Sequence, residues 1–150
     1  MKMAEVIEAV TEIEERTEGE WGSTEAGFEI KTDRQTISLM IDNYQSCCEA
    51  WGYLMSEDDP AKFVGATLFG VRLTDTNRSS MQFLKSGDEG YYEADWDDPK
   101  VEHVSDGDVM FVDIQTDRGI LQFVAYNSHN GYYGHEVRVK SEQLTHSEVL

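Results

Sequence analysis

The sequence predicts an α+β fold: an antiparallel β-meander sheet with an N-terminal helix and a short second helix. Three observations predict it. Apolar residues first recur at helical spacing, then alternate with polar ones, and finally form three strand-like runs separated by turn residues. The 150 residues suit a single domain. We expect a helix over 3–17 and a β-rich core over 27–140, with a long loop at 75–108.

The N-terminal helix is predicted from one apolar face. Its members fall at i, i+1, i+4 and i+7: Val6, Ile7, Val10 and Ile13. This spacing places them together on a helix with 3.6 residues per turn, while the other face is rich in glutamate. A glutamate- and glycine-containing linker follows over 18–26.

The middle of the chain changes to a period of two. Alternating apolar residues predict two short strands joined by a turn at Asp33 and Arg34; they are Phe28, Ile30, Ile37, Leu39 and Ile41. Asp59 followed by Pro60 is a typical helix start and predicts a short helix that ends at Gly65. A further strand is expected over 67–73.

The C-terminal part contains the clearest strand signals. Three runs alternate in polarity: Val109–Gln115, Ile120–Tyr126 and Tyr133–Val139. Asp117, Arg118 and Gly119 form the first predicted turn. An Asn-Gly pair within residues 129–131 predicts that the last two runs form a hairpin.

The charge of the chain limits its partners. Thirty acidic and 12 basic residues give a formal net charge of −18. Long nucleic acids and anionic membranes both require basic surface, so neither is an expected partner. No apolar run is long enough to span a membrane, and we expect a cytoplasmic protein. The evenly scattered acids favour adaptation to high salt; a decoy that mimics nucleic acid is the alternative.

The two cysteines, Cys47 and Cys48, are adjacent and have no third cysteine to pair with. Neighbouring cysteines form only a strained ring, and zinc sites usually present Cys-x-x-Cys pairs. We therefore expect reduced cysteines, no metal and no cofactor. No nucleophile motif or phosphate-binding glycine loop is present, so we expect a protein that is not an enzyme.

Two motifs carry a resemblance. Cys47, Cys48 and Glu49 form the first, and the second is Asn-Gly-Tyr-Tyr at 130–133. With the elements between them, from Phe28 to Lys140, they resemble a family of small phage proteins, although Ser46 stands where that family usually has Asp. The resemblance implies an anti-defence sponge of the anti-CBASS type. Such proteins hold a cyclic dinucleotide such as cyclic GMP-AMP, or a relative of cyclic ADP-ribose, without chemical change.

The candidate ligand-binding residues are aromatic, amide, imidazole or guanidinium side chains. Aromatic rings can stack on a base, and arginine can contact phosphate. Each type also has an ordinary structural alternative: core packing, turn formation or a surface ion pair. The candidates are Tyr44, Trp51, Arg72, Trp96, Arg118, Tyr126, Asn127, His129, Asn130, Tyr132, Tyr133, His135 and Arg138.

Three functions are compatible with these residues. The first is a non-enzymatic viral sponge for a cyclic nucleotide messenger, built as a homo-oligomer. The second is an acidic interaction protein that occupies a basic host site. The third is a small enzyme that degrades cyclic nucleotides through Cys48, Glu49 or a histidine.

Overall fold

The computed structural model describes residues 4–18, 23–44, 50–79, 82–84, 101–103, 108–128 and 134–150. Nine strands form one sheet in which every neighbouring pair is antiparallel, in the order β11-β10-β3-β2-β1-β5-β8-β9-β4. They are β1 (Glu5–Glu18), β2 (Ser23–Thr32), β3 (Thr36–Asp42), β4 (Ala50–Met55), β5 (Thr67–Thr74), β8 (Asp108–Thr116), β9 (Gly119–Ser128), β10 (Glu136–Lys140) and β11 (Thr145–Val149). A separate parallel pair consists of β6 (Gln82–Leu84) and β7 (Val101–His103).

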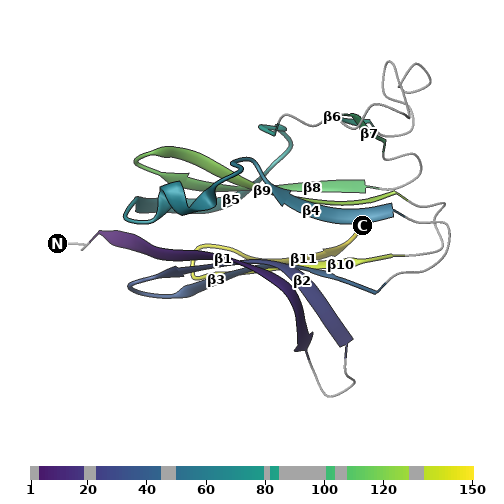
Figure 1. Cartoon of the computed structure of the whole chain (residues 1–150), viewed down its shortest axis with the longest axis horizontal. Coiled ribbons are helices and arrows are strands. Elements are labelled where there is room, and N and C mark those ends of the chain that lie inside the picture. The colour runs from purple at the N-terminus through teal and green to yellow at the C-terminus, as the bar shows by residue number, and fades with distance from the viewer. Residues whose placement is uncertain are drawn as a thin grey trace.

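The large sheet folds over on itself into two layers (Figure 1). One layer contains β4, β5, β8 and β9, and the other contains β1, β2, β3, β10 and β11. The first residues of β1 join the layers, because Glu5 and Val6 lie opposite Leu68 and Thr67 of β5. The architecture is therefore an all-β sandwich.

The core lies between the layers and is made of alternating residues from both. Ile30, Ile37 and Leu39 are completely buried on one side, and Val112 and Phe123 on the other. Alternation follows from the strand period of two, which sends every second side chain toward the facing sheet. The strands predicted around residues 28–30, 37–41, 67–73, 109–115 and 120–126 are all present.

The prediction of an α+β fold with an N-terminal helix over 3–17 is wrong. That segment is strand β1, and two β-bulges explain its helix-like spacing. Its pairing with β2 slips by one residue between Ile7 and Ala9, and again between Ile13 and Arg16. Each bulge adds a residue without an opposite partner. Ile7 and Val10 therefore both contact the core although they are three positions apart.

The predicted short second helix is a single 3₁₀ turn, η1 (Pro60–Phe63), so the described residues contain no α-helix. Phe63 is buried beneath it. The turn lies beside β1: the Gly65 N–H donates to the Ile7 carbonyl at 2.8 Å. It thereby helps to close one end of the sandwich.

The predicted meander is also wrong at its last step, because β9 and β10 do not pair. β9 lies between β8 and β4, whereas β10 lies between β3 and β11 in the other layer. The chain therefore crosses between the layers after β9. The sequence pattern identified neither β4 nor β11 as a strand.

No helix in the part of the chain described here is long and apolar enough to cross a bilayer.

Candidate functional site

Three of the predicted ligand-binding rings meet at one end of the sandwich. The imidazole of His135 stacks on Tyr44, with ring centroids 4.5 Å apart and planes 12° apart. It also stacks on Trp51, at 5.1 Å and 26°. His135 is completely buried, whereas Tyr44 is 48% exposed. The group formed by Tyr44, Trp51 and His135, here called the ring cluster, therefore extends from the interior to the surface.

Backbone contacts hold His135 in this position. Its Nδ1 lies 2.7 Å from the carbonyl oxygen of Asp42. Because a carbonyl oxygen only accepts hydrogen bonds, Nδ1 carries the hydrogen. The backbone of His135 also exchanges two hydrogen bonds with Leu150, at 2.9 and 3.1 Å. Asn127, another predicted residue, donates from Nδ2 to the same Leu150 carbonyl at 3.0 Å.

Both sequence motifs lie in segments outside the described residues, and the described residues that flank these segments lie at the ring cluster. The segment 45–49, with Cys47 and Cys48, runs from Tyr44 to the start of β4. The segment 129–133 runs from the end of β9 to Gly134, whose carbonyl accepts a hydrogen bond from the Tyr44 hydroxyl. Ala50 and Ser128 are paired residues of β4 and β9. The flanking residues of both segments thus converge on one place.

Five candidates lie outside the described residues: Trp96, His129, Asn130, Tyr132 and Tyr133.

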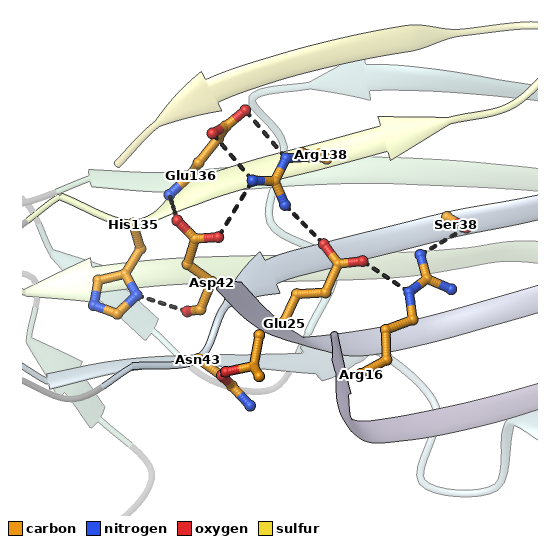
Figure 2. Close-up of polar contacts among 9 residues, drawn as sticks. Arg16, Glu25, Ser38, Asp42, Asn43, His135, Glu136 and Arg138 are labelled. Carbon is orange, nitrogen blue, oxygen red and sulfur yellow. Dashed lines mark hydrogen bonds and ion pairs between the residues drawn. The ribbon is translucent and has the colours of Figure 1, made fainter. Parts of the chain in front are cut away.

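Arg138 belongs to an ion-pair network on the outer face of the layer that contains β2, β3 and β10 (Figure 2). Its Nη1 lies 2.8 Å from Glu25, and its Nε lies 3.2 Å from Glu136. A third contact, at 3.5 Å, reaches Asp42, the residue whose carbonyl holds His135. Arg138 is therefore linked to the ring cluster, but carboxylates surround its guanidinium.

Arg16 extends this network from β1. Its Nε lies 2.8 Å from Glu25 and its Nη1 lies 3.0 Å from Glu29. Glu25 is only 1% exposed although it lies on the outer face of the sheet. A buried carboxylate is costly unless opposite charges are paired with it. The guanidinium groups of Arg16 and Arg138 provide those charges to Glu25.

The remaining described candidates do not join the ring cluster. Arg118 donates to the carbonyls of Lys62 and Val64, both at 2.8 Å, and so fixes the chain after η1. Arg72 is exposed on β5, 3.9 Å from the buried Asp113. Tyr126 lies across from Gly52 in the β4–β9 pair, and a side chain at Gly52 would overlap its hydroxyl. These arrangements match the structural alternatives for these residues.

Asp42 and Leu150 contribute to the site but were not among the predicted residues. Both act through backbone carbonyls, which leave no signal in side-chain identity. Within the described ranges, no group of three or more His, Cys, Asp or Glu side chains is placed to hold a metal ion.

Comparison with known families gives a match over most of the chain. Neither the curated proteins nor the solved structures include a match to this chain. The matching family model covers residues 4–139 and is described as a domain of unknown function, DUF7448. The match includes β1 to β9 and most of β10, so it extends over both layers and almost the whole sandwich. The chain therefore belongs to the DUF7448 family.

Proposed function

We propose that this protein binds a cyclic nucleotide at the ring cluster and holds it without chemical change. The observation that carries the proposal is the convergence of Tyr44, Trp51 and His135 in one stack with an exposed outer ring. A base stacked on an aromatic side chain gains about 1–3 kcal/mol in nucleic-acid complexes. Tyr44 provides that surface.

Polar groups beside the rings support the same ligand class. Within the described part of the chain, the buried indole N–H of Trp51 meets no hydrogen-bond acceptor. A base or ribose oxygen could accept from it, which would satisfy a donor that is costly to leave unpaired. Arg138 provides a guanidinium that is linked to His135 through Asp42. A phosphate would replace Glu136, whose side chain is 39% exposed and makes two contacts of 3.2 Å with Arg138.

The biological role in this proposal is sequestration. A viral protein that retains a cyclic nucleotide messenger lowers its free concentration and so blocks the host defence that the messenger activates. This part rests on the resemblance of the Cys-Cys-Glu and Asn-Gly-Tyr-Tyr motifs to phage proteins. Both motifs are in the segments that begin and end at the ring cluster.

The test is to incubate the purified protein with a panel of cyclic mono- and dinucleotides and cyclic ADP-ribose relatives, remove free ligand, and then denature the protein. We expect chromatography to recover one class of ligand intact. Recovery of a hydrolysed ligand would show an enzyme instead. No retained ligand at micromolar protein would contradict the proposal and favour the acidic interaction protein.

A further inference from the structure

We propose that a second site, a cleft between the two layers, binds a small organic ammonium ion with an apolar body. The cleft has a volume of about 360 Å³. It is lined by Val10, Glu12, Phe28, Tyr53, Leu54, Met55, Glu57, Asp58 and Pro60. Ligand pockets for small molecules start at about 300 Å³, so the cleft suits a compact amine rather than a nucleotide dimer.

The lining residues come from β1 and β2 in one layer, from β4 in the other, and from the segment that follows β4. Figure 1 shows the end of β1 and the start of β2 curving away from β4. The two bulges of β1 account for this bend, since an extra residue in one strand of a pair increases its local twist. At the cleft, the Tyr53 hydroxyl of β4 donates to Glu12 of β1 at 2.8 Å.

The inner wall of the cleft is apolar and firmly packed. Phe28 and Met55 are each 8% exposed and belong to the hydrophobic core. The rings of Phe28 and Tyr53 meet edge to face, with centroids 5.7 Å apart. This wall can bury the apolar part of a ligand, and the face of an aromatic ring also attracts a cation.

The charged groups that line the cleft are all negative. Glu12, Glu57 and Asp58 provide three carboxylates, and no lysine, arginine or histidine is among the described residues that line the cleft. Lys62 contacts Glu57 at 3.1 Å but does not line the cleft. The site therefore attracts cations and repels phosphates. This charge distinguishes it from the ring cluster at the other end of β4.

Tyr53 keeps one carboxylate directed at the cleft. Burial and the hydrogen bond to Glu12 both raise the pKa of this phenol well above its ordinary value of 10.0. The hydroxyl therefore remains a donor at neutral pH and fixes the position of the Glu12 carboxylate. An ammonium group in the cleft would find the oriented Glu12 carboxylate, and the lining also contains the carboxylates of Glu57 and Asp58.

The first experiment uses phenethylammonium chloride as the probe, titrated into the full chain by calorimetry and followed by NMR shifts. Its neutral analogue 2-phenylethanol and its anionic analogue 3-phenylpropionate serve as controls of similar shape. We expect the cation to bind, the alcohol to bind roughly tenfold more weakly and the anion not to bind. Equal binding of the alcohol, or no binding of the cation at millimolar concentration, would overturn the proposal.

The second experiment removes single charges. Glu12→Gln and Asp58→Asn should each weaken binding by about fivefold, the upper range for an exposed ion pair. Asp59→Asn is the matched control, because it removes the same charge from a neighbouring residue outside the lining. Unchanged affinity in both lining variants, or an equal loss in Asp59→Asn, would contradict the site. If Glu12→Gln does not fold, the comparison of Asp58→Asn with Asp59→Asn decides alone.

Discussion

Replacing Glu25 with Gln should destabilise the fold strongly, because this carboxylate is buried between two guanidinium groups. It is 1% exposed, and both Arg16 and Arg138 lie 2.8 Å from it (Figure 2). A hydrogen bond to a charged group contributes about 1.5–3 kcal/mol. The amide keeps the shape but removes the charge that both arginines face. Both arginines remain about one-third exposed, so solvent limits the loss, and we expect about 2–3 kcal/mol in total.

Glu29→Gln is the matched control, because Glu29 also contacts Arg16, at 3.0 Å, but is 35% exposed. An exposed pair contributes about 0–1 kcal/mol. Urea titration at neutral pH gives the free energy of unfolding of each variant. In thermal melts, the difference for Glu25→Gln corresponds to roughly 4–12 °C for a domain of this size. A loss for Glu25→Gln no larger than that for Glu29→Gln would refute the reasoning.

Three further predictions concern the backbone, pH and salt. Gly27 and Gly119 both have positive φ, so alanine strains the backbone at either position. Gly27→Ala should still lower the melting temperature more than Gly119→Ala, because a Cβ at Gly27 would also overlap the Leu39 carbonyl, whereas the space around Gly119 is open. Similar melting temperatures would contradict this packing. The pKa of the Tyr53 phenol is raised in the folded chain, so the stabilisation by its hydroxyl is complete below pH about 10 and is lost as the pH rises further. The urea midpoint should therefore fall less steeply between pH 8 and 11 in Tyr53→Phe than in wild type. Equal slopes would contradict this prediction. The net charge of −18 predicts a melting temperature that rises between about 0.1 and 1 M salt, as the Debye length shortens from about 10 to about 3 Å, and a flat profile would argue against charge repulsion.

The strands that were predicted correctly are those whose signals are local. β2 and β3 are neighbours in the chain, and so are β8 and β9, with turn residues between them. In these hairpins, alternation reports which side chains face the core, and the turn chemistry reports where the chain reverses. Both kinds of information are contained within about twenty residues.

The N-terminal strand could not be predicted by the same reasoning because its pattern is irregular. Its bulges convert a period of two into intervals of three, and intervals of three resemble one face of a helix. The partner of β10 was also beyond the local pattern. An Asn-Gly turn favours reversal, but β10 pairs with β3, almost a hundred positions earlier in the chain.

The candidate site was predicted in part. Residue type identified Tyr44, Trp51 and His135 as ligand-binding candidates, and the structure brings these three together. Residue type alone could not show that the Arg118 guanidinium donates hydrogen bonds to two backbone carbonyls instead of facing a ligand. Such roles depend on distant segments that meet only in the folded chain.

The most direct test of a ligand site at the ring cluster is a calorimetric titration with the cyclic nucleotide that the protein retains best. Wild type is compared with Tyr44→Ala and with Phe69→Ala, which removes another exposed ring, on β5, 67% accessible. Loss of one stacked base should weaken binding to Tyr44→Ala by about 1–3 kcal/mol, or roughly 5- to 150-fold, and leave Phe69→Ala unchanged. Wild-type affinity in a folded Tyr44→Ala protein would contradict the site.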